Sequence, residues 1–150
     1  MVSNGKRIGD RFFPYNINLP DDPNWSYVTR EGLAEYIVRH RASATMSCLL
    51  GPALDFCEER TGDGLWAEIG DAFVFSAERR GAVSISRGMD ERVNGLRDRL
   101  IATTTSAAAE VRWSNRFVVT AALYAFCAHL VRSRGRRLPI PAADAASLSA

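Results

Sequence analysis

The fold is decided by residues 81–131, which begin Gly81-Ala82-Val83-Ser84-Ile85-Ser86-Arg87. In this segment Val83 and Ile85 alternate with small polar residues, which is the period of a β-strand that buries one face. A helical stripe follows, with apolar side chains four, three and four residues apart at Met89, Val93, Leu96 and Leu100. The stretch therefore predicts a strand that leads directly into an amphipathic helix.

A second helical run occupies residues 117–131, after a polar break that begins at Thr103. It is apolar on nearly every side, interrupted only by Thr120 and His129, and such a helix must be covered all round. Its 15 residues fall short of the roughly 20 that are needed to cross a bilayer. We therefore expect this helix to form the centre of a protein core.

The same order of elements precedes this stretch. We expect a strand, a helix and a second helix at residues 13–19, 25–40 and 46–57. Gly51-Pro52 interrupts the last of these patterns, which predicts a kinked or late-starting helix. After a break at Thr61-Gly62-Asp63-Gly64, residues 65–80 fit either a short helix followed by a strand or an irregular linker.

The chain therefore contains an internal duplication of strand, helix and helix. Ile17-Asn18-Leu19 corresponds to Val83-Ser84-Ile85 at an offset of 66 residues, and Ala53-Leu54 corresponds to Ala122-Leu123 at an offset of 69. One copy cannot bury its own faces, but two copies can, if the strands pair antiparallel and the helices share a core. We expect a mainly α fold with a two-stranded antiparallel ribbon, in which residues 13–19 pair with about residues 82–87.

These patterns divide the chain into five parts. Residues 1–12 form a flexible basic arm, and residues 13–60 form the first half. Residues 61–80 form a linker, and residues 81–132 form the second half. Residues 133–150 form a basic tail that becomes disordered. Because both halves belong to one chain and form one fold, we expect the minimal unit to be a monomer.

Composition and charge narrow the classes of function. The 150 residues are 47% hydrophobic and 24% charged, which is ordinary for a globular protein. The three cysteines and an N-terminus without an apolar run favour a cytosolic protein. Residues 1–11 and 130–150 together hold seven basic residues against two acidic ones, which fits a polyanionic partner. Solvated tails that merely aid solubility are an equally good explanation.

The residue pattern supports neither an enzyme active site nor a metal site. Cys127 and His129 are two residues apart on one helix, hence about 200° apart around it, and cannot form a nucleophile–base pair. Cys48 and Cys57 lack the spacing of zinc ligands. We expect no catalytic residue, no metal site and no cofactor.

A two-stranded ribbon fits the major groove of B-DNA, where its outward side chains meet base edges. Small polar side chains lie opposite the buried face of each expected strand, at Asn16, Asn18, Ser84 and Ser86. Asparagine can pair with adenine, and serine can donate or accept, although a plain solvated strand face explains the same pattern. Each second helix also begins with residues that suit either a helix cap or a phosphate contact, at Ser43, Thr45, Ser114 and Asn115.

In these features the chain resembles the ribbon-helix-helix family of DNA-binding proteins. More narrowly, it resembles the single-chain tandem form found among virulence accessory proteins of T-DNA transfer in tumour-inducing plasmids. The resemblance covers about residues 12–132 and rests on four segments, Tyr15-Asn16-Ile17-Asn18-Leu19, Met46 to Phe56, Val83-Ser84-Ile85 and the alanine-rich run from Val119 to Cys127.

The resemblance implies non-catalytic binding of double-stranded DNA in the bacterial cytoplasm, as an accessory factor in conjugative or T-DNA transfer. It implies a relaxase or another transfer protein as a further partner, and no membrane. The expected base-contacting residues are Asn16, Asn18, Ser84, Ser86 and Arg87. The expected phosphate-contacting residues are Lys6, Arg7, Arg11, Ser43, Thr45, Ser114, Asn115, Arg132, Arg134, Arg136 and Arg137.

Two serines stand where the family commonly has basic or amide side chains, which departs from its pattern and lowers the expected sequence specificity. Two alternatives stay open. The first is a helical protein–protein interaction module of a transfer complex that never touches DNA. The second is a transcriptional or partition repressor of the same fold.

Overall fold

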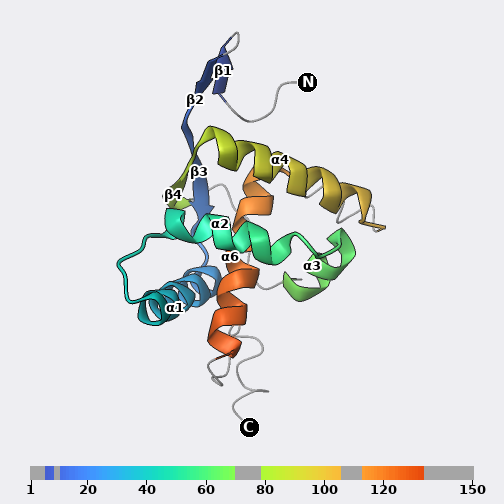
Figure 1. The fold of residues 1–150 in the computed structure, drawn as a ribbon. Coiled ribbons are helices and arrows are strands. Elements are labelled where there is room, and N and C mark those ends of the chain that lie inside the picture. The colour runs from blue at the N-terminus through green and yellow to red at the C-terminus, as the bar shows by residue number, and fades with distance from the viewer. Residues whose placement is uncertain (1–5, 9–10, 70–78, 106–112, 134–150) are drawn as a thin grey trace.

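The computed structural model describes residues 6–8, 11–69, 79–105 and 113–133. Within them the chain is mainly helical, with two small antiparallel sheets (Figure 1). Its elements are β1 (Lys6–Ile8), β2 (Arg11–Phe13), β3 (Tyr15–Pro20), α1 (Pro23–His40), α2 (Met46–Cys57), α3 (Gly62–Ile69), β4 (Arg79–Ile85), α4 (Arg87–Ala102) and α6 (Asn115–Arg132). The prediction of a mainly α fold with a two-stranded antiparallel ribbon is confirmed.

The ribbon consists of β3 and β4, which pair antiparallel although they are far apart in the sequence, as predicted. The partners are Tyr15 with Ile85, Asn16 with Ser84, Ile17 with Val83, Asn18 with Ala82 and Pro20 with Arg79, with an irregularity between Asn18 and Pro20. One face of the ribbon is buried, at Ile17, Leu19, Val83 and Ile85. Burying such side chains contributes about 1.5–3 kcal/mol each, which fixes the face that turns inward.

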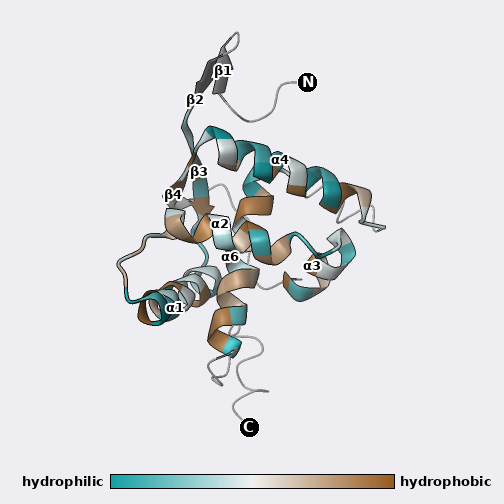
Figure 2. Cartoon of the chain, in the orientation of Figure 1, coloured by the Kyte–Doolittle hydropathy of each residue, from teal (hydrophilic) through white to brown (hydrophobic). Residues whose placement is uncertain are grey.

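The centre of the core is α6, as its all-round apolar pattern predicts. It packs against α1, α2, α3, α4 and β3, and most of its residues are buried. The buried Thr120 in its middle is satisfied because its hydroxyl donates to the Arg116 carbonyl at 2.8 Å. In Figure 2 α6 is brown over much of its length, whereas α4 carries many hydrophilic residues.

A close crossing joins α1 to α6. A Cβ added to Gly32 would lie 2.3 Å from the Cβ of Cys127 and 2.6 Å from its Cα, so only glycine fits at this point. Nearby, the Trp25 indole donates to the Thr120 carbonyl at 3.0 Å. These contacts set the position of α1 against the central helix.

The structure adds detail on three stretches of the sequence expectations. In the expected arm, β1 and β2 form an antiparallel pair, with Lys6 opposite Phe13. In the expected linker, residues 62–69 form α3, which favours the short-helix alternative, while residues 70–78 lie outside the described residues. Finally, α2 begins at Met46 and runs through Pro52, so the late-starting alternative is wrong. Nearly all of the predicted tail also lies outside the described residues.

Among the described residues, no helix combines the length and the apolar character that a bilayer-spanning segment needs.

Candidate nucleic-acid interface

The outer face of the ribbon carries three of the predicted base-contacting residues. Asn16 and Ser84 are exposed and paired across the ribbon, and the Ser84 hydroxyl donates to the Asn16 side-chain oxygen at 3.3 Å. Asn18 is half-buried and lies opposite the exposed Ala82. These side chains therefore share one polar surface, as the alternation predicts.

The N-terminal turns of α2 and α6 lie against the two edges of this ribbon. Next to β4, the backbone N–H of Ser84 donates to the Ser47 hydroxyl in the first turn of α2 at 3.1 Å. Next to β3, the Arg116 guanidinium in the first turn of α6 donates to the Asn18 carbonyl at 2.9 Å. Both helix ends, whose free amides favour an anion, thus flank the polar face.

The four predicted phosphate-contacting residues at these two helix ends lie in different environments. Ser43 and Thr45 are exposed before α2, where the Thr45 hydroxyl lies 3.4 Å from the Cys48 sulfur. Ser114 is exposed and caps α6, since its hydroxyl accepts from the Phe117 N–H at 3.2 Å. Asn115 is fully buried, so its side chain cannot make the predicted phosphate contact.

Asn115 belongs instead to a polar network beneath the ribbon. Its amide donates to Asn94 at 2.7 Å, and its side-chain oxygen accepts from Arg97 at 2.8 Å. Asn94 in turn donates to the buried Asp90 at 3.3 Å, and Asp90 accepts from the Tyr15 hydroxyl at 2.7 Å. Burial raises the pKa of Tyr15 most, and the hydrogen bond to Asp90 raises it further. The network ties β3 to α4 and α6 and so fixes where the ribbon sits.

Ser86 does not lie on the strand, which corrects the prediction that it shares the outer face with Ser84, and Arg87 also lies beyond the end of the strand. β4 ends at Ile85, and the Ser86 hydroxyl accepts from the Met89 N–H at 3.3 Å as the cap of α4. The cap satisfies a helix-end amide that a longer strand would leave unpaired. Arg87 is exposed in the first turn of α4, next to the end of the ribbon.

Four of the remaining predicted phosphate contacts lie in described elements other than the β3–β4 ribbon. Lys6, Arg7 and Arg11 belong to the β1–β2 pair, which precedes β3. Arg132 is exposed at the far end of α6, about 25 Å along the helix from the end that flanks the ribbon. Arg134, Arg136 and Arg137 lie outside the described residues. Charge clustering along the sequence gave no information on which end of α6 meets the ribbon.

The cysteines and His129 do not form a reactive pair. Burial raises the pKa of the Cys127 thiol to about 12 where it packs against α1, and does the same for Cys57. His129 is exposed, with its ring 4.8 Å from that of Phe56. Cys48 is exposed, and its bonds with Thr45 lower its pKa. Among the described residues, no group of three or more His, Cys, Asp or Glu side chains could hold a metal ion.

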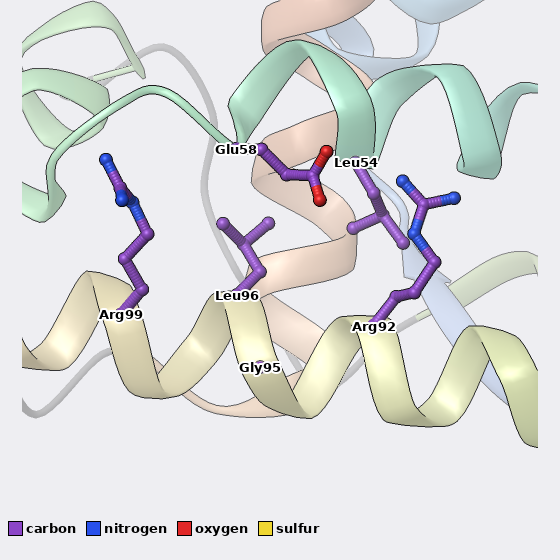
Figure 3. Close-up of a pocket in the computed structure, with 6 residues that line it drawn as sticks. All are labelled: Leu54, Glu58, Arg92, Gly95, Leu96 and Arg99. Carbon is purple, nitrogen blue, oxygen red and sulfur yellow. The ribbon is translucent and has the colours of Figure 1, made fainter.

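A groove of about 330 Å³ runs between α2 and α4 (Figure 3). Its lining residues are Leu54, Glu58, Arg92, Gly95, Leu96 and Arg99. Both guanidinium groups are engaged by neighbouring segments, since Arg92 pairs with Asp55 and Arg99 donates to the Arg60 carbonyl at 3.2 Å. The groove contains none of the predicted site residues, and it belongs to the seam between two helices.

Sequence reasoning missed three residues of the ribbon surface, Ser47, Ala82 and Arg116. The offset of 69 residues relates Ser47 to Arg116, and the offset of 66 relates Asn16 to Ala82, so the repeat itself held the signal. Comparison with protein-family models, curated proteins and solved structures gives no match to this chain.

Proposed function

We propose that this protein binds double-stranded DNA, without catalysis, by placing the outer face of the β3–β4 ribbon in the major groove. The observation that carries the proposal is the division of the ribbon into two faces. Ile17 and Val83 on the inner face are buried in the core, while the outer face presents Asn16, Asn18 and Ser84. A two-stranded ribbon is narrow enough for the major groove, which is about 12 Å wide.

The strand register supports a tandem ribbon-helix-helix with a pseudo-two-fold axis. Ile17 pairs with Val83, the residue to which the 66-residue offset assigns it, so the axis would pass between them. Ser47 and Arg116, related by the other offset, are each the second residue of their helix. Each bonds to the strand of the opposite half, Ser47 to β4 and Arg116 to β3.

Phosphate groups on either side of the groove would meet the first turns of α2 and α6. Neither first turn contains an acidic residue, and the helix dipole favours a negative charge at both. Arg87 adds an exposed positive charge near one end of the ribbon. This arrangement supports contacts to DNA backbones that straddle the ribbon, with Ser43, Thr45 and Ser114 among the contributing side chains.

The biological process that we propose is DNA transfer. In this proposal the protein is a monomeric, cytoplasmic accessory factor in conjugative or T-DNA transfer, acting with a relaxase or another transfer protein. The support for the process is the resemblance of the sequence to tandem ribbon-helix-helix proteins of such systems.

Fluorescence anisotropy with a labelled random duplex, repeated from about 50 to 200 mM salt, tests DNA binding. For Z phosphate contacts, log K is expected to fall with log salt at a slope of about −0.9Z. Arg87→Ala should lower that slope by about 1, while Arg30→Ala, which removes the same charge from the exposed face of α1, should leave it unchanged. Absence of binding at low salt would remove the proposal in favour of a protein-interaction module.

A further inference from the structure

The two ends of the ribbon face differ although the backbone positions correspond. The 66-residue offset relates Asn16 to Ala82 and Asn18 to Ser84. The strand pairing places Asn16 with Ser84 on one side of the Ile17–Val83 pair, and Asn18 with Ala82 on the other. A homodimer would present identical pairs at the two ends, because its two strands have one sequence.

The chemistry of these two pairs is unequal. At the Asn16 end both side chains are polar and exposed, and they hydrogen-bond each other at 3.3 Å, which orients the Asn16 amide. At the Asn18 end one partner is a half-buried amide and the other, Ala82, offers only a methyl group. A methyl group can contact a thymine methyl but forms no hydrogen bond with a base edge.

The charge around the ribbon is also unequal. The Asn16 end adjoins Arg87 and receives the chain from the β1–β2 pair (Figure 1). Arg87 is thus an exposed cation beside the Asn16 end, whereas Arg116 at the Asn18 end is half-buried and bonded to the Asn18 carbonyl.

From this asymmetry we infer that the protein, if it binds DNA as proposed above, recognises a non-palindromic duplex and binds it in one fixed orientation. The half-site under Asn16 and Ser84 provides most of the sequence discrimination. The half-site under Asn18 and Ala82 is read weakly. Since a good bidentate base contact discriminates by roughly 5- to 150-fold, a difference of one such contact is enough to set a preferred orientation.

The native thiols provide a probe of this orientation. Cys48 is exposed in the first turn of α2, next to Ser47, which bonds Ser84 at the Asn16 end. Cys57 and Cys127 are buried, and burial raises the pKa of both to about 12. An iron chelate that cleaves DNA can thus be attached to Cys48 of the unmodified sequence.

The experiment selects duplexes from a random library with the full-length protein and then maps cleavage by the Cys48 conjugate on the selected site. Anisotropy first verifies that the conjugate keeps the affinity of the unlabelled protein. The expected result is a non-palindromic site that is cleaved on one side only, with the cleavage moving to the other side when the site is inverted. A palindromic site, equal cleavage on both sides, or binding without any selected sequence would overturn the inference while leaving DNA binding intact.

A symmetrised variant provides the matched control. Ala82→Asn with Ser84→Asn makes the two ends of the exposed face alike and touches no buried residue. It should bind the inverted and original orientations within about twofold of each other and cleave on both sides. A variant that keeps one-sided cleavage would show that these four positions do not set the orientation. If the wild-type protein shows no salt-dependent binding of DNA, the proposed function itself is wrong.

Discussion

The crossing of α1 over α6 yields a stability prediction whose size follows from the geometry. Gly32→Ala gains about 1 kcal/mol of helix propensity, because alanine is a better helix former than glycine. The added methyl group, however, would lie 2.3 Å from the Cβ of Cys127 and 2.6 Å from its Cα. Because the second contact is with backbone, no side-chain rotation can relieve it and the two helices must separate. Such overpacking costs about 1–3 kcal/mol or more, so we expect net destabilisation.

Gly95 provides the matched control, since it lies in α4, is exposed, and has nothing within 4 Å of an added Cβ. Gly95→Ala should stabilise the protein by about 0.5–1 kcal/mol. The difference between the two variants then isolates the cost of the crossing. Urea denaturation, followed by fluorescence of Trp25 and Trp113, measures both values. A Gly32→Ala variant as stable as Gly95→Ala would refute the close approach of α1 and α6.

Three further predictions concern the polar network and the thiols. Asn115→Ala should cost about 1–3 kcal/mol in urea denaturation, because it removes buried partners of Asn94 and Arg97 while leaving the exposed ribbon face unchanged. The raised pKa of Tyr15 means that its stabilising contribution is complete below about pH 10 and is lost as pH rises through the folded-state pKa. Tyr15→Phe should therefore show a shallower loss of stability above pH 10 than wild type does in alkaline thermal melts. Iodoacetamide should modify Cys48 in the native protein and leave Cys57 and Cys127 unmodified until urea is added; rapid native labelling of all three, measured by mass spectrometry, would contradict their burial.

The ribbon and the central helix were predictable because both depend on simple patterns of burial. Alternation at Ile17 and Val83 assigned the inner face, and the pairing of these two residues agrees with the offset found in the sequence. Residues 117–131 are apolar on nearly all sides, which required burial on all sides, and α6 is surrounded by the other helices. In both cases local sequence and tertiary packing impose the same solution.

The predictions of site residues that were wrong depend on where other parts of the chain lie. Ser86 fits either a strand face or a helix cap, and only the position of the Met89 N–H decides between them. From the sequence, Asn115 is expected at an exposed helix start. In the structure, Asn94 and Arg97 of α4 are its hydrogen-bond partners, so its side-chain amide can be buried. Arg132 shows the same limit, because charge in a sequence does not reveal which end of a helix meets the ribbon.

The central claim is that DNA contacts the outer face of the β3–β4 ribbon. The most direct measurement is a two-dimensional ¹⁵N NMR titration of the full-length protein with duplex DNA at low salt, followed residue by residue. We predict that the largest shift changes fall on the side-chain amides of Asn16 and Asn18 and the backbone amide of Ser84, while exposed residues of α3 stay unchanged. Shift changes confined to α1 or α3, or no changes at all, would contradict the account.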